Sequence, residues 1–437
     1  MTKPGEDGET MARGGASATY REVIGLTGPL LPVMSFLARL PTATIQFGSV
    51  LLIARTSGSL AAAGLTGGAL ALGQVACGPL VGRLADRHGQ RAVVLVFALA
   101  NALAVAALVA GALAGLPTPA LVVLGAAAGA TVPQIGPMAR ARLVALARRT
   151  GARESTVGAA LSFESTLDEI SFVLGPALVG LAAVTAHPAY ALGGAAVLVG
   201  LCGTGFALHR TADVERPRAL RTPSERGTGP AAPRIPRAIH PLRAALALQG
   251  AMFGACQAGI TALTERLGQP EQAGLVYAAM GVMSAVAGFS MAVVPSRVGL
   301  SARWRAATGA AFALSLPLLW TDGLPALYVT VTVLGVAYAP HLITVFGLTE
   351  RVVPPARLAE AMTVATSALV GGQALAVAGA GRLAESYGPA AAFGVASLAA
   401  ALAWLIALAV RPASYTGRTA GSERHARVPE RPPSPSG

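Results

Sequence analysis

Long apolar blocks separated by short polar loops make up most of the chain. A helix that spans the hydrocarbon core of a membrane needs roughly 20 mostly apolar residues, and one block after another reaches that length. The pattern predicts spanning helices near 28–53, 58–82, 92–115, 118–138, 157–184, 188–208, 243–264, 272–295, 303–321, 324–347, 360–384 and 389–411. We therefore expect an all-α membrane protein with about twelve transmembrane helices.

Three polar segments divide these helices into units. We expect an N-terminal tail over 1–27, a Pro- and Arg-rich loop over 209–242, and a disordered tail over 412–437. The loop separates two six-helix halves, 28–208 and 243–411. Parallel halves of this kind are a known plan of secondary transporters.

The charges support a membrane location and set an orientation. Only 12% of the residues are charged, against about 25% in soluble domains. Arginines gather in every second loop, and cytoplasmic loops carry the excess of basic residues. The loop after span four is expected to carry Arg140, Arg142, Arg148, Arg149 and Arg153. Both termini are thus predicted to be cytoplasmic, in the inner membrane of a bacterium. The net charge of +13 is spread over these clusters, so we expect no nucleic-acid partner.

One loop carries a recognisable motif. Residues 82–91, between spans two and three, read Gly-Arg-Leu-Ala-Asp-Arg-His-Gly-Gln-Arg. This resembles the signature loop of the major facilitator superfamily, G-x-L-x-D-R-x-G-R-R/K, with Gln90 where a basic residue is usual. The resemblance implies a gating loop whose carboxylate, Asp86, binds the start of span eleven and stabilises the outward-open state. Its residues would be Gly82, Arg83, Asp86, Arg87, Gly89 and Arg91. The alternative is a basic loop that only sets topology.

A second, partial motif lies in span five. Gly175, Pro176 and Gly180 resemble part of the antiporter motif of the same family, G-P-x-x-G-G. Val179 replaces one glycine of that motif. The alternative reading is a proline-kinked helix with no bearing on the direction of transport.

Charged residues also occur where lipid-facing helices should have none. Arg39 lies in span one, and span five contains Glu164, Asp168 and Glu169. A charge at the bilayer centre costs about 2.5–3.5 kcal/mol on insertion scales, so such residues are kept for pairing or for a pathway. Our hypothesis is that Arg39 pairs with Asp168 or Glu164 and that a carboxylate there takes up and releases protons. The alternative is a buried structural ion pair.

Polar stripes predict a substrate cavity. In span one, Ser35, Arg39 and Thr42 recur at spacings of four and three and so share a helix face. In the family that the motif indicates, spans one, four, seven and ten line the substrate path. The residues expected in the cavity are Ser35, Thr42, Gln46, Gln134, Gln249, Phe253, Gln257, Tyr338 and His341.

These features favour a secondary active transporter that exports small organic molecules and is driven by proton entry. The alternative is a proton-coupled importer or facilitator of a nutrient such as an amino acid or a sugar. No phosphate-binding loop or nucleophile motif is present, so we expect no enzyme and no cofactor. The three cysteines are widely spaced and predict no metal site. The expected partners are the substrate, protons and membrane lipid, with the chain acting as a monomer.

Overall fold

The computed structural model describes residues 21, 23–25, 27–214, 235–269, 272–291, 294–295 and 297–410. Most of the two expected tails and of the central loop lies outside these residues. Within the described part the chain is helical and contains no strand, as the apolar pattern predicted.

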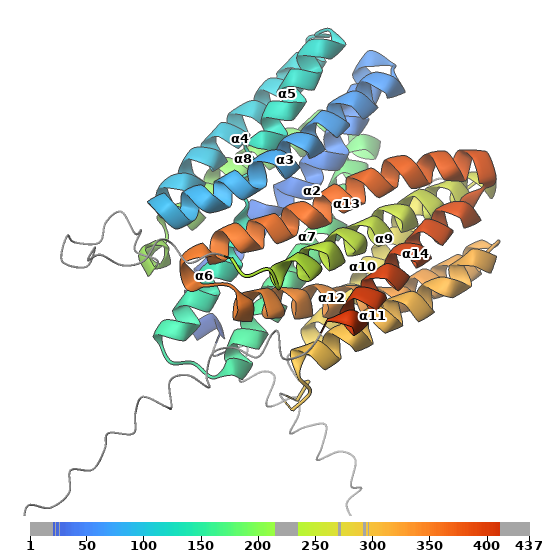
Figure 1. Ribbon diagram of the computed structural model, residues 1–437. Coiled ribbons are helices and arrows are strands. Elements are labelled where there is room, and N and C mark those ends of the chain that lie inside the picture. The colour runs from blue at the N-terminus through green and yellow to red at the C-terminus, as the bar shows by residue number, and fades with distance from the viewer. Residues whose placement is uncertain are drawn as a thin grey trace, which may run out of the picture.

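The first seven long helices form one half of the molecule (Figure 1). They are α2 (Leu30–Ser57), α3 (Leu60–His88), α4 (Gln90–Leu113), α5 (Thr118–Ala130), α6 (Ile135–Arg149), α7 (Glu154–Thr185) and α8 (Pro188–Leu208), followed by the short 3-10 helix η1 (Arg210–Val214). The second half contains α9 (Ile239–Arg266), α10 (Gln272–Ser290), α11 (Leu300–Ser315), η4 (Leu316–Trp320), α12 (Leu324–Val352), η5 (Pro355–Arg357), α13 (Leu358–Tyr387) and α14 (Pro389–Ala409).

Eleven helical segments of the described chain are long and apolar enough to cross a membrane. The fourth of these combines α5 and α6 into Thr118–Arg149. The expected span at 303–321 corresponds to α11 and η4, and α11 alone has only 16 residues. The α-helix ends at Ser315 because the chain continues in 3-10 geometry and has a proline directly after Leu316.

The fourth span differs from its prediction. Its helix breaks over 131–134 and resumes at Ile135, where Gln134 adopts a left-handed backbone with φ of 53°. The resumed helix α6 carries Arg140 and Arg142 into the protein interior, where both side chains are buried. The prediction that these two arginines lie in a loop was therefore wrong. Arg148 and Arg149, at the end of α6, are exposed.

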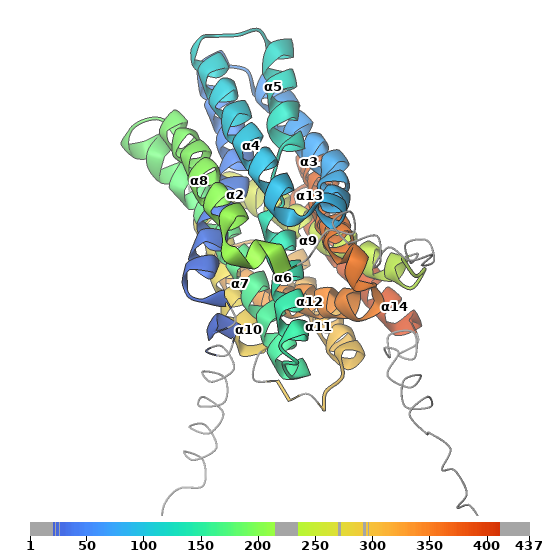
Figure 2. The ribbon, with the colours of Figure 1, turned by 90° about the vertical axis from the view of Figure 1, so that its left-hand side faces the viewer.

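The two halves meet along two helix pairs, α3 with α13 and α7 with α10 (Figures 1 and 2). Glycines bring the first pair close together. A Cβ on Gly82 would lie 2.8 Å from the Cα of Glu360, and a Cβ on Gly78 would lie 2.5 Å from Ser367 Oγ. Small residues at such positions let helix backbones approach. We call the end of the bundle that holds Arg83, Arg148 and Arg357 the gate end.

The same helix faces separate toward the opposite end. Near the middle of α13, the face that packs on α3 still contacts it: a Cβ on Gly371 would lie 3.5 Å from Val75 Cγ1 of α3. One turn further on, Leu375 of α13 is 78% exposed, and Leu72, one turn before Val75 on α3, is 69% exposed. The halves are thus packed together at the gate end and apart beyond the middle of these helices.

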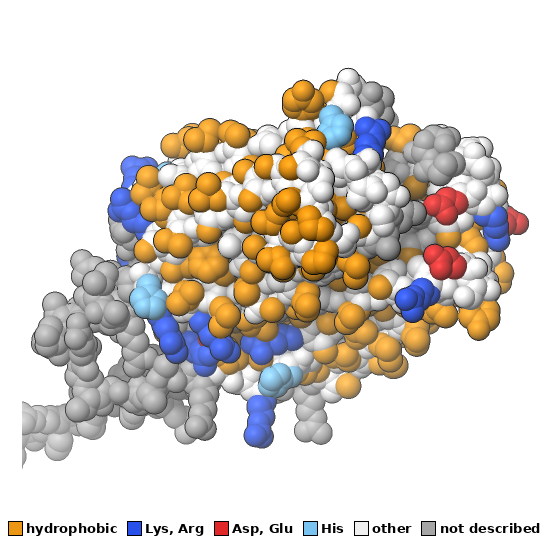
Figure 3. All heavy atoms as spheres, turned by 90° about the horizontal axis from the view of Figure 1, so that it is seen from above, with side chains coloured by type: hydrophobic (Ala, Val, Ile, Leu, Met, Phe, Trp, Pro, Cys, Tyr) orange, Lys and Arg blue, Asp and Glu red, His pale blue; other side chains and the backbone are white. Residues whose placement is uncertain are grey.

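The outer surface is largely apolar. Figure 3 shows hydrophobic side chains across the middle of one face and arginines gathered toward its edges. Exposed leucines such as Leu103 and Leu201 lie on the outside of α4 and α8. Lipid is the environment that makes such a surface favourable.

Candidate functional site

Arg39 of α2 lies at the centre of a buried polar network. Its Nη1 donates to Asp168 Oδ1 at 2.8 Å and to the Glu164 carbonyl oxygen at 2.8 Å. Its Nη2 donates to the Glu164 carboxylate and to Ser35 Oγ, and its Nε donates to the Ser35 carbonyl oxygen. These five hydrogen bonds match the five N–H donors of a guanidinium group. The Arg39 side chain is therefore fully satisfied within the first half.

Asp168 of α7 is shared between two arginines. Oδ1 accepts from Arg39, and Oδ2 accepts from Arg140 Nη2. The carboxylate also faces the first turn of α6, since a Cβ on Gly136 would lie 2.8 Å from Oδ1. The positive end of a helix dipole stabilises an anion there. With Glu164 and the two arginines, Asp168 completes a network of two cations and two anions.

Arg140 is the member of this network that the sequence reading missed. Its side chain is 1% exposed, and its guanidinium lies 4.0 Å above the ring of Phe346 on α12. The Nε and Nη1 atoms have no hydrogen-bond partner among the described residues. The break over 131–134 and the new helix that starts at Ile135 place Arg140 inside, and the apolar pattern of the sequence carries no signal for that break.

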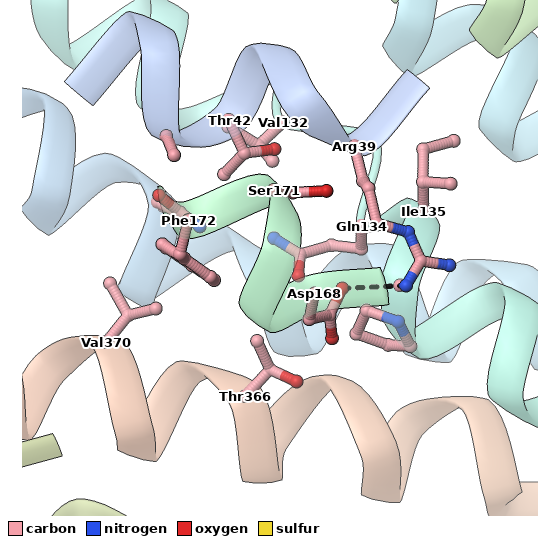
Figure 4. A pocket seen from close by; sticks show the side chains of 14 residues that line it. Arg39, Thr42, Val132, Gln134, Ile135, Asp168, Ser171, Phe172, Thr366 and Val370 are labelled. Carbon is pink, nitrogen blue, oxygen red and sulfur yellow. Dashed lines mark hydrogen bonds and ion pairs between the residues drawn. The ribbon is translucent and has the colours of Figure 1, made fainter. Parts of the chain in front are cut away.

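A pocket opens beside this network (Figure 4). Arg39 and Thr42 line it from α2, Gln134 from the break before α6, and Asp168 from α7. Thr366 and Val370 of α13 close it from the second half; Ala43, Gln74, Val132, Ile135, Gly136, Pro137, Ser171 and Phe172 complete the lining. Asp168 is 19% exposed, whereas Glu164 is 2% exposed, so Asp168 is the carboxylate that this pocket reaches.

The other residues expected in the first-half cavity hold neighbouring polar groups. Ser35 is buried and accepts from Arg39. Gln46 donates to Gln74 Oε1 at 2.7 Å, which connects α2 to the pocket wall on α3. The side chain of Glu169 lies outside those that the structure describes.

The residues expected in the second half form a separate cluster. Gln249 Nε2 donates to the Tyr338 carbonyl oxygen at 2.8 Å, and Phe253 packs against Tyr338 with ring centroids 5.5 Å apart. His341 is buried, and its Nε2 has no partner among the described residues. Gln257 is half-buried, and its carbonyl oxygen accepts from Thr261. None of these five side chains lines the pocket at Asp168.

The motif at 82–91 was predicted as a loop, but it forms the last turns of α3, the linking residue Gly89 and the first turn of α4. Its α3 part contacts the start of α13. Asp86 accepts from the backbone N–H of Glu360 at 2.8 Å and of Ala359 at 3.3 Å. Arg83 Nε donates to Glu360 Oε1 at 2.7 Å, and Arg357 Nε donates to Glu360 Oε2 at 2.8 Å. A carboxylate at a helix N-terminus satisfies backbone donors that lack intrahelical partners.

The remaining residues of this motif have simpler positions. Gly89 joins α3 to α4 with φ of 90°, a conformation that favours glycine. Arg87 and Arg91 are exposed. Gln90, the departure from the family pattern, is buried and accepts from Arg142 Nε at 3.0 Å.

A further ion pair connects the halves at the gate end. Arg148 of α6 contacts the carboxylate of Glu350 on α12, and its Nη2 lies 3.3 Å from the Glu350 carbonyl oxygen. Phe346 and Glu350 are one turn apart on α12 and face Arg140 and Arg148 respectively. Helices α6 and α12 therefore meet through two arginine side chains.

The partial motif of span five lies at a helix contact. A Cβ on Gly175 would lie 2.8 Å from both the Cβ of Ala43 and the backbone nitrogen of Thr44. Pro176 follows inside α7, and Gly180 has no atom near its Cβ direction. Close packing of α7 on α2, one turn from Arg39, explains Gly175.

Comparisons with known proteins agree on the fold. Residues 31–324 match the sequence model of the Major Facilitator Superfamily. The human organic anion transporter MFSD10 (TETRAN) is 19% identical, with a TM-score of 0.64 over 91% of this chain and 99% of that one. A bacterial homologue of the iron transporter ferroportin in an outward-facing state is 15% identical, with a TM-score of 0.65 over 87% and 98%. FucP in the outward conformation is 15% identical, with a TM-score of 0.60 over 87% and 97%.

A comparison with curated protein sequences finds no match. The family match covers well over half of the chain, and the structures that resemble it over almost their whole length are transporters. The chain belongs to the Major Facilitator Superfamily and is a membrane transporter of small molecules, not an enzyme.

Proposed function

We propose that the chain is a proton-coupled secondary transporter that exports small organic molecules by alternating access. The observation that carries this proposal is the pocket beside Asp168. Ionisable side chains inside membrane-spanning segments mark ion or proton pathways, and Asp168 lies within such a segment and lines a cavity between the halves. Asp168 is the proton carrier in this proposal, and Arg39 pairs with both Asp168 and Glu164.

Export is the direction that the sequence favours. Gly175, part of the antiporter-like motif, packs on α2 one turn from Arg39. Proton entry at Asp168 would weaken its pairing with both arginines and so change the wall of the pocket where a substrate binds. The substrate would bind between the halves, near Thr42 and Gln134 of the first half.

A nutrient importer or facilitator is the second candidate. The specific observation in its favour is the pair of carboxamides, Gln74 and Gln134, in the pocket wall. Amide groups can donate and accept hydrogen bonds to a polar solute such as a sugar or an amino acid. Of the structurally similar proteins, one is an organic anion transporter and another a fucose:proton symporter, so the shared fold serves different substrates.

The gate-end contacts support an alternating cycle. Asp86 at α13 and Arg148 at Glu350 would hold the gate end closed while the opposite end is open. We propose that the gate end is cytoplasmic in a bacterial inner membrane, with both termini on that side, because basic loops gather there. We also propose that one chain is the working unit, since its two halves supply both walls of the pocket.

Growth of an efflux-deficient bacterium tests the proposal. Cells that express the chain are scored against a broad panel of toxic compounds, with Asp168→Asn and Arg39→Ala beside the parent at matched membrane levels. The proposal expects protection by the parent and loss of protection in Asp168→Asn. Protection that survives Asp168→Asn would make the network a structural ion pair, and no protection at all would favour uptake of nutrients, measured next in proteoliposomes.

A further inference from the structure

Arg140 is the cation of the buried network that touches both halves. Its Nη2 donates to Asp168 in the first half, while its guanidinium face covers the ring of Phe346 in the second. Arg39, by contrast, makes all five of its hydrogen bonds to α2 and α7 in the first half. Any separation of α6 from α12 changes the surroundings of Arg140 and leaves the partners of Arg39 in place.

The burial of Arg140 depends on Asp168. A buried cation is favourable only when a counter-ion and hydrogen bonds replace the water that it has lost. Arg140 is 1% exposed, and Nε and Nη1 have no partner among the described residues. The carboxylate of Asp168 is thus its counter-ion, and the ring of Phe346 adds a cation–π contact.

We propose that Arg140 is a positioning residue that links the protonation of Asp168 to the opening of the gate end. When Asp168 is ionised, its negative charge balances the positive charge of Arg140. Arg140 then stays buried against Phe346, which favours the closed gate end. When Asp168 takes up a proton, Arg140 is left as a buried cation without a counter-ion. Moving α12 away then lets water reach the guanidinium, so protonation favours the open gate end.

The surroundings of Asp168 make it the group that responds. Arg39 from α2, Arg140 from α6 and Glu164 from α7 are the charged side chains packed around it in the described structure. The facing walls of the pocket contribute Gln74 from α3 and Thr366 from α13, whose side chains carry no charge. Glu164 remains bound to Arg39 and is hardly exposed, so the pocket delivers a proton to Asp168 first.

This inference rests on the proposed proton coupling, but its test needs no substrate. Spin labels on cysteines introduced at Arg149 and Ala356, exposed residues at the gate-end limits of α6 and η5, report the separation of the halves. The full chain is placed in lipid nanodiscs, with its three native cysteines replaced by alanine. Distances between the labels are measured by pulsed electron paramagnetic resonance from pH 8 to pH 5.

For the parent, the ratio of the long-distance to the short-distance population should rise as the pH falls. The rise is at most about tenfold per pH unit, which is the limit for an equilibrium coupled to one proton. Asp168→Asn should be open at every pH, because Arg140 has lost its counter-ion. Adding Arg140→Gln to Asp168→Asn should close the gate end again at every pH, because the uncompensated cation has gone. This recovery in the double variant is what a merely structural role would not produce.

Arg142 supplies a matched control. It lies on the same helix, is equally buried and stacks on an aromatic ring at 3.9 Å, but that ring is Phe206 of the first half. Arg142→Lys should leave the pH response as in the parent. If Arg140→Gln does not fold, Phe346→Leu carries the test, since it removes the contact to α12 and should flatten the response.

Three results would overturn the inference. They are a parent whose label distances do not change with pH, an Asp168→Asn variant that is as closed as the parent at pH 8, and a double variant that stays open. Each is a result on conformation alone. Failure of the transport proposal would appear instead as protection of cells that does not depend on Asp168.

Discussion

The contact between Asp86 and the start of α13 gives the sharpest prediction for the gate end. The Asp86 carboxylate accepts two backbone N–H groups, from Ala359 and Glu360, at the helix N-terminus. Asp86→Asn keeps the size of the side chain and one oxygen acceptor but removes the negative charge. We therefore expect the closed gate end to become less stable without a change in the fold of either half.

The size of the effect follows from the two contacts. A hydrogen bond to a charged group contributes about 1.5–3 kcal/mol, against about 0.5–1.5 kcal/mol for a neutral one. The loss of a charge at a helix N-terminus costs about 0.3–1 kcal/mol more when the site is partly exposed. Allowing for solvent screening, roughly 2 kcal/mol is lost, which corresponds to about a 30-fold rise in the open-to-closed ratio.

Thiol modification measures this ratio. Thr363 is buried on α13 against Gly82 of α3, so a cysteine at this position reacts with a maleimide only when the gate end opens. In a background without the native cysteines, the reaction rate of Thr363→Cys should rise about 30-fold on adding Asp86→Asn. The control is Asp322→Asn, an exposed carboxylate in the loop between η4 and α12, which should leave the rate unchanged. A rise of less than about twofold from Asp86→Asn would refute the reasoning, because it would correspond to less than about 0.5 kcal/mol.

Three further predictions concern stability, each measured by thermal unfolding in detergent. Gly175→Val should lower the stability by about 1–3 kcal/mol, because its side chain would overlap the backbone of α2. Gly89→Ala should lower it by about 1 kcal/mol, because φ is 90° at the turn between α3 and α4. His209, just beyond α8, has its pKa lowered below 6.5 by burial and by nearby Arg142 and Arg210. Folding therefore favours the neutral imidazole, so the contribution of His209 to the free energy of unfolding is complete above pH 6.5 and is lost as the pH falls below that value. His209→Gln should make the unfolding midpoint less sensitive to pH between 7 and 5. An unchanged sensitivity would contradict this.

The apolar pattern was sufficient for the helices because each spanning helix must satisfy its backbone hydrogen bonds within itself. Block lengths therefore translate directly into helices such as α8, predicted at 188–208 and found at Pro188–Leu208. The pattern failed where a span is not one continuous α-helix. The break before Ile135 and the 3-10 turn after Ser315 depend on local backbone conformation, which hydropathy does not encode.

The candidate site was only partly accessible from sequence. Spacings of three and four placed Ser35, Arg39 and Thr42 on one face of α2; the structure puts Arg39 and Thr42 at the pocket and binds Ser35 to Arg39. The participation of Arg140 could not be read from spacing, because its position depends on the break in span four. The separation of Gln249 and Tyr338 from the pocket likewise depends on how the two halves pack, which requires the three-dimensional structure.

The central claim, that Asp168 couples proton movement to transport, is tested most directly in proteoliposomes that contain a pH-sensitive dye. A compound against which the chain protects cells is added under an imposed pH gradient, and proton flux is followed for the parent and for Asp168→Asn. The account predicts compound-dependent proton flux with the parent and none with Asp168→Asn, although both proteins are folded and present at equal density. Equal proton flux in the two proteins, or transport by the parent that ignores the gradient, would contradict it.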